Sequence, residues 1–136
     1  MKNIKQYYKE LGKLVYAVAA ADGTVQSEEK EKLHQFVLKE MAYHEPTVDS
    51  SGMNQAFYVD FEFDTTEEKH PPASDIIKSY TRFAHTNFEP GDEQLIKNSI
   101  KLLEAVALAY SKKNEKNIID TIRIEMNEIS KTLANK

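Results

Sequence analysis

The sequence has 136 residues, enough for one domain with a single hydrophobic core, and 32 of them are Ile, Leu, Val or Phe, enough apolar side chains for the chain to fold. The absence of cysteine excludes disulfides, thiol catalysis and Cys-ligated metal centres, and the formal net charge of −4 argues against nucleic-acid binding. The longest apolar run, residues 17–21, is too short to cross a membrane, and the first residues lack a signal-peptide core. We therefore expect a cytoplasmic protein without direct membrane insertion.

The low content of glycine and proline favours helices over sheets. Only four residues of each type occur, and tight turns between strands depend on them. Residues 4–21 have apolar side chains at steps of three and four, the spacing of an amphipathic helix. The members of this stripe are Ile4, Tyr8, Leu11, Val15 and Val18. This helix should end near Asp22, because Gly23 can adopt the positive φ that often follows a helix.

A second helix is predicted to begin at Glu28. Ser27 is a suitable N-cap, and Glu28 and Glu29 place negative charge in the first turn, where the helix dipole stabilises it. The residues expected on its buried face are Leu33, Phe36, Val37 and Met41. Residues 46–52 are rich in turn-forming types, so a loop should follow.

Residues 53–70 allow two interpretations. Phe57, Val59, Phe61 and Phe63 occupy alternate positions, as in a half-buried strand. However, no other segment alternates in this way, and a lone strand would leave its backbone hydrogen-bonding groups unpaired. We therefore predict a helix.

Three further helical segments follow. Ser74 or Asp75 can cap a helix after Pro72, and residues 96–110 form another amphipathic stripe. Residues 118–133 carry apolar side chains at steps of three and four, which pack in the core or form the seam of a homodimer. The whole pattern predicts an all-α fold, a compact bundle of five to six helices in one domain that spans residues 1–136.

The corner between the first two helices carries the most specific motif. Asp22, Gly23, Val25 and Glu29 match the second half of a calcium-binding loop, which makes Asp22, Glu28 and Glu29 candidate metal ligands. The first half of such a loop is absent, because Val18 and Ala20 stand where oxygen ligands are needed. The structural alternative is a corner in which Gly23 makes the turn, Val25 enters the core, and Asp22 or Ser27 caps the next helix.

The same corner resembles the tellurite-resistance TerB-like proteins. The residues that carry the resemblance lie between Leu14 and Leu33: an apolar helix ending in Ala20, Ala21, Asp22 and Gly23, then Val25, Ser27, Glu28 and Glu29. The resemblance implies a compact, all-helical, TerB-like protein of the bacterial cytoplasm. It also implies a helix over residues 53–66 and partners in a membrane-associated stress-response complex, and it implies no established reaction.

Two Glu-x-x-His pairs suggest a different function. Glu31 with His34, and Glu67 with His70, have the spacing with which helices of di-metal carboxylate bundles present their ligands. Such an enzyme would also need inward-pointing glutamates from two other helices. The alternative is that these residues form surface ion pairs.

The negative charge is concentrated in the middle of the chain. Residues 40–70 contain eight of the 22 acidic residues and one basic residue, Lys69. The candidate partner-binding residues are Asp60, Glu62, Asp64, Glu67 and Glu68, with aromatic neighbours that one helix cannot bury entirely on one side. We expect a non-enzymatic module without a cofactor that binds a protein partner through this acidic and aromatic face. The alternative is a solvated face.

Overall fold

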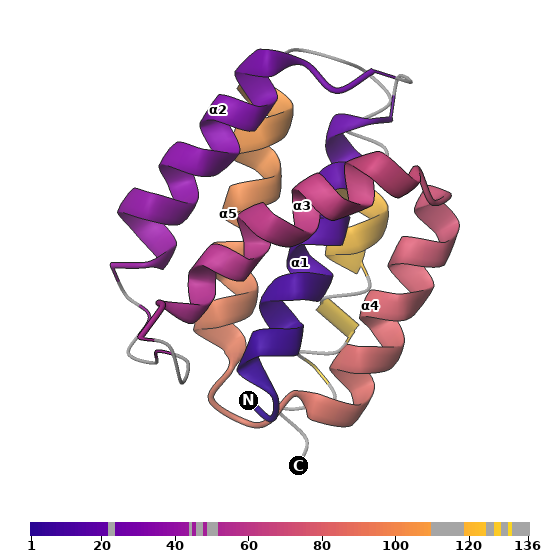
Figure 1. Ribbon diagram of the computed structural model, residues 1–136. Coiled ribbons are helices and arrows are strands. Elements are labelled where there is room, and N and C mark those ends of the chain that lie inside the picture. The colour runs from indigo at the N-terminus through magenta and orange to yellow at the C-terminus, as the bar shows by residue number, and fades with distance from the viewer. Residues whose placement is uncertain are drawn as a thin grey trace.

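Helix α1 (Ile4–Ala19) runs through the middle of the molecule (Figure 1). Eleven of its sixteen residues are buried. Helix α3 (Tyr58–Lys69) crosses it, and α4 (Ala73–Asn87) and α5 (Glu93–Ala109) also pack against it. Helix α2 (Ser27–Phe36) packs on α5 and continues into a π-helical turn, η1 (Val37–Met41), and a short 3-10 turn, η2 (Gln55–Phe57), precedes α3.

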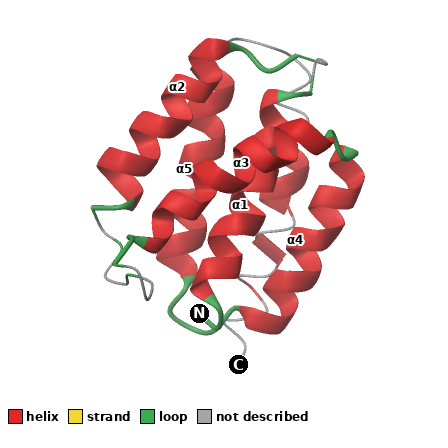
Figure 2. Ribbon diagram, viewed as in Figure 1, coloured by secondary structure: helices red, strands yellow, loops and turns green. Residues whose placement is uncertain are grey.

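The computed structural model describes residues 1–21, 24–43, 45, 48, 52–109, 119–124, 127, 128 and 131. Within these residues the chain consists of helices and connecting loops without a strand (Figure 2), which confirms the predicted all-α bundle. None of the helices in the described ranges has the length and apolar character needed to cross a bilayer. Residues 119–124 are helical, and Ile119 and Ile122 are buried in the core, as the core interpretation of that stripe requires.

The helix predicted for residues 53–70 is confirmed, because α3 spans most of that segment. Val59, Phe63 and Thr66 are its buried residues, at steps of four and three, so they form one stripe against α1. Phe61 lies outside this stripe and is 49% exposed. The alternating apolar residues therefore lie on two different faces of a helix, with Val59 and Phe63 buried and Phe61 exposed, and do not line one face of a strand.

Gly12 allows α1 and α3 to approach each other closely. A Cβ atom at Gly12 would lie 2.5 Å from the carbonyl oxygen of Val59 and 3.2 Å from the backbone nitrogen of Phe63. These two atoms belong to the backbone of α3, and the third near atom is the Cβ of Glu62 at 3.1 Å, so none of them can rotate aside as the end of a flexible side chain can. The helix accepts a glycine in its interior because only glycine fits this contact.

A chain of hydroxyl groups joins α1 to α4 and α5 inside the core. The Ser99 hydroxyl donates to the carbonyl oxygen of Leu95 at 2.8 Å, so it must accept its bond from Tyr7. Tyr7 has then used its only hydrogen and accepts from the Tyr80 hydroxyl at 3.3 Å. Burial raises the pKa of Tyr7 to about 12, so this hydroxyl remains protonated at neutral pH and continues to donate.

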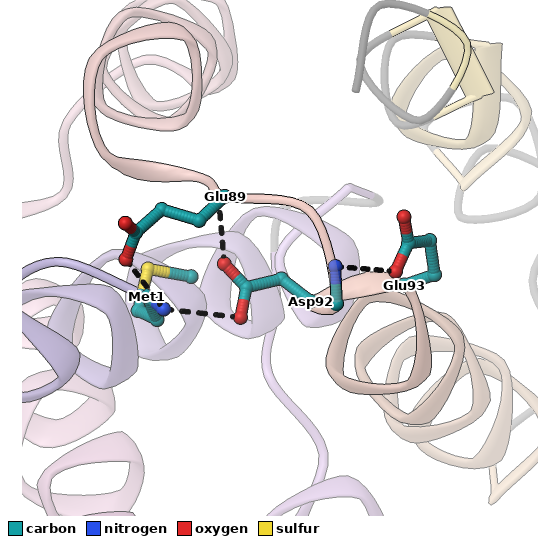
Figure 3. Close-up of polar contacts among 5 residues, drawn as sticks. Met1, Glu89, Asp92 and Glu93 are labelled. Carbon is teal, nitrogen blue, oxygen red and sulfur yellow. Dashed lines mark hydrogen bonds and ion pairs between the residues drawn. The ribbon is translucent and has the colours of Figure 1, made fainter. Parts of the chain in front are cut away.

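The first residue of the chain is attached to the turn between α4 and α5 (Figure 3). The Met1 ammonium lies 3.0 Å from a carboxylate oxygen of Glu89 and 3.1 Å from one of Asp92, and the second oxygen of Asp92 accepts from the Glu89 backbone N–H at 2.8 Å. Burial lowers the pKa of this ammonium, but its hydrogen bonds outweigh that effect and raise the pKa above its ordinary value. The same contact lowers the pKa of Glu89.

Three local features differ from the sequence-based expectations. Helix α2 begins at Ser27 with Gln26 at the N-cap, so Ser27 is not the cap. Helix α4 has Pro72 at the N-cap without a side-chain capping bond, and Ser74 and Asp75 lie within its first turn, so neither is the cap. The π-helical turn η1 was not predicted, since i to i+5 hydrogen bonds leave no distinctive sequence pattern.

Replacement of Gly12 by alanine should destabilise the protein. Overpacking costs about 1–3 kcal/mol and the better helix propensity of alanine returns about 1 kcal/mol, so we expect a net loss of up to about 2 kcal/mol in the free energy of unfolding. Urea denaturation of the wild type and Gly12→Ala measures this difference. A variant more stable than the wild type would show that the two backbones do not meet at Gly12.

Candidate functional site

In the first candidate site, at the corner before α2, Glu29 caps the helix. The side-chain oxygen of Glu29 accepts from the backbone N–H of Gln26 at 2.9 Å, and Glu29 is completely buried. This is one half of a capping box, in which a carboxylate in the first turn satisfies a backbone donor that the helix leaves unpaired. Glu28 is exposed and Val25 packs against the core, whereas Asp22 and Gly23 lie outside the described residues.

The two Glu-x-x-His pairs do not meet. Glu31 and His34 are exposed on α2, and the Nδ1 atom of His34 lies 3.2 Å from a carboxylate oxygen of Asp60. Glu67 contacts Lys30 at 2.7 Å, and His70 ends α3 in a left-handed conformation with its Nδ1 atom 3.3 Å from the Tyr16 hydroxyl. Among the residues that the structure describes, no three His, Asp or Glu side chains are grouped so that they could hold a metal ion.

The five predicted partner-binding residues all lie on α3, but they do not form one uniform face. Asp60 and Glu67 are bound by His34 and Lys30 of α2. Burial raises the pKa of Asp60, and the hydrogen bond from His34 opposes this effect. The two contacts run in opposite directions along the two helices, so they join α2 and α3 as an antiparallel pair. These two carboxylates therefore have a structural role that the sequence did not indicate.

The remaining acidic residues are more accessible. Glu62 is half-buried, and Asp64 and Glu68 are exposed without an ion pair in the described part of the chain. Phe61, Asp64, Thr65 and Glu68 are separated by three, one and three residues, so they share one side of the helix. We call these four exposed residues the α3 outer face. It combines an apolar ring with two unpaired negative charges.

A group of aromatic and basic residues borders the α3 outer face at its N-terminal end. The ring of Phe61 packs edge-on against the ring of Tyr58, with centroids 6.0 Å apart. The ammonium groups of Lys5 and Lys9 lie 4.7 and 5.8 Å from the Tyr58 ring centroid, so the aromatic pair is backed by positive charge from α1. Tyr58 is therefore less available to a partner than Phe61.

Sequence reasoning missed a second region, a pocket of about 750 Å³ between the start of α1, the π-helical turn η1 and the first turns of α5. Tyr8, Glu45 and Asp92 line it from three separate parts of the chain. The Tyr8 hydroxyl donates to Glu45 at 2.6 Å, and burial together with this bond raises the pKa of Tyr8. A tyrosine held protonated in this way is poorly suited to acid–base catalysis at neutral pH.

The comparisons with known proteins give no further guide. No protein-family model, curated protein or solved structure matches this chain.

The capping role of Glu29 can be separated from metal binding. Glu29→Ala removes the acceptor for the Gln26 N–H and should lower the free energy of unfolding by about 1–2 kcal/mol. Glu28→Ala is the matched control, because Glu28 is exposed in the same turn, and should stay within about 0.5 kcal/mol of the wild type. Chemical denaturation with and without calcium measures both effects. Calcium stabilisation of the wild type that is lost in Glu29→Ala would instead assign Glu29 to a metal site.

Proposed function

We propose that this protein is an interaction module without enzymatic activity that binds a basic protein partner through the α3 outer face. The observation that carries the proposal is the exposure of Phe61, at 49%, on the same side of α3 as Asp64 and Glu68. An exposed aromatic ring can anchor a partner, and unpaired carboxylates beside it favour a partner of opposite charge.

Electrostatics favour a binding face over a catalytic one on α3. A catalytic site needs groups with complementary roles, such as a base beside a nucleophile or an acid beside a base. The acidic residues of α3 that have basic neighbours, Asp60 and Glu67, hold α2 in place through His34 and Lys30. Those on the outer face, Asp64 and Glu68, have no ion pair in the described part of the chain. This arrangement can attract a cationic surface, and its hydroxyl, on Thr65, donates to the carbonyl oxygen of Phe61 rather than to a base.

The biological setting of the proposal rests on the TerB-like resemblance of residues 14–33. It would make this chain a cytoplasmic component of a bacterial stress-response system related to tellurite resistance, with its partner in a membrane-associated complex. A charged docking face suits such a role, because electrostatic steering speeds association and gives an affinity that weakens with salt.

Charge reversal on the outer face tests the proposal. Asp64→Lys combined with Glu68→Lys should abolish copurification of partners from the native host and leave the melting temperature nearly unchanged. These positions are chosen because reversal of Asp60 or Glu67 would also break the contacts between α2 and α3. Wild-type copurification should itself decrease as the salt concentration rises.

A control variant must change the net charge equally at a different surface. Glu28→Lys combined with Glu31→Lys does so on α2, where both residues are exposed, and should retain every partner. If the α3 variant retains the same partners as the α2 variant, the outer face is only a solvated surface and the proposed function is wrong.

A further inference from the structure

The pocket beside the π-helical turn has an apolar wall. Ile4 from α1 and Leu95 from α5 line it, together with Phe36 and Met41 at the two ends of η1. All four pack against the core cluster or belong to it, so the wall is backed by packed side chains. Its volume, about 750 Å³, lies within the range of sites that hold small organic molecules.

The π-helical turn explains how Phe36 and Met41 both reach this wall. The backbone N–H of Ala42 bonds to the carbonyl oxygen of Val37 at 2.8 Å, which is the i to i+5 pattern of a π-helix. This wider turn brings residues five apart closer together around the helix axis, and Phe36 and Met41 both line the pocket. In a regular α-helix these residues would be about 140° apart around the axis. Single π-helical turns occur frequently at functional sites.

The polar part of the pocket is rich in carboxylates. Glu45 accepts the Tyr8 hydroxyl, and Asp92 is bound to the Met1 ammonium and a backbone N–H (Figure 3). Glu40, from the π-helical turn itself, is exposed. Its carboxylate has no hydrogen bond or ion pair in the described part of the chain. Among the described residues of the lining, Lys101 is the one lysine.

We propose that this pocket binds an organic cation with an apolar body. The ammonium group would lie against the carboxylates of Glu40 and Glu45, and the apolar body would pack on Phe36 and Met41. Charge complementarity favours a cation, because the Glu40 carboxylate has no counter-ion among the residues that the structure describes. The rings of Phe36 and Tyr8 add cation–π attraction, and the flexible thioether of Met41 adapts to the shape of the body. This inference is independent of the partner-binding role of α3.

Titration with phenethylammonium tests the proposal, with 2-phenylethanol as the neutral molecule of similar shape. The readout is the NMR signal of the Met41 methyl group, assigned by comparison with Met41→Leu. Phenethylammonium should shift this signal in a saturable manner, and 2-phenylethanol should bind about tenfold more weakly because it lacks the charge.

Two variants test whether the carboxylate of Glu40 binds the ammonium group. Glu40→Gln should weaken phenethylammonium binding about tenfold, and it should fold normally because Glu40 is exposed. Glu28→Gln removes an exposed carboxylate from the first turn of α2, does not line the pocket, and should leave binding unchanged. No saturable shift at Met41, or equal binding of the amine and the alcohol, would overturn the proposal. Tighter binding of 3-phenylpropionate would also overturn it, because Lys101 would then be the anchor.

Discussion

The direct backbone contact between α1 and α3 at Gly12 is the constraint on which the rest of the bundle depends. It brings Val59 and Phe63 against α1, and α1 in turn supplies the surface on which α4 and α5 pack. A larger residue at position 12 would force the two helices apart, because its Cβ atom would lie 2.5 Å from the carbonyl oxygen of Val59. The core around α1 would then have to be filled differently, since protein interiors tolerate few voids. The position of α3 also decides which of its residues face outward, so the α3 outer face is a consequence of this contact.

Polar interactions position the elements that the apolar core leaves less constrained. The chain of hydroxyls from Tyr80 through Tyr7 to Ser99 fixes α4 and α5 relative to α1. The carboxylates of Asp60 and Glu67 on α3 bind His34 and Lys30 and so attach α2 to α3. The two proposed binding regions consist of charged and apolar side chains that take no part in these interactions. The outer face has an exposed ring beside exposed carboxylates that form no ion pair with any described residue, and the pocket has Glu40 beside an apolar wall. Both favour a cationic partner, in keeping with the acidic middle of the chain.

The sequence predicted the helices well, because amphipathic spacing reflects the burial that holds them. The choice of a helix for residues 53–70 succeeded through an argument about unpaired backbone groups, although the alternation pointed elsewhere. The role of Gly12 could not be predicted from the sequence. A glycine inside a helical segment indicates only a lower helix propensity and does not show which backbone packs against it. The partners of Asp60 and Glu67 lie 26 and 37 residues away along the chain, so no local pattern shows them. The π-helical turn, and with it the pocket, likewise depends on tertiary packing. The metal-binding hypothesis at Asp22 stays a prediction, because that residue lies outside the described part of the structure.

Native-state hydrogen exchange tests the central claim that the contact between α1 and α3 organises the fold. The backbone amides of Leu14, Val15 and Phe63 should exchange only through global unfolding, with the free energy that denaturant titration gives for the whole protein. Amides of α2, which is attached at the side of the bundle, should exchange through openings of lower free energy. If the amides of α3 instead exchange through a local opening while α1, α4 and α5 stay protected, α3 is a peripheral element and its contact with α1 does not organise the fold.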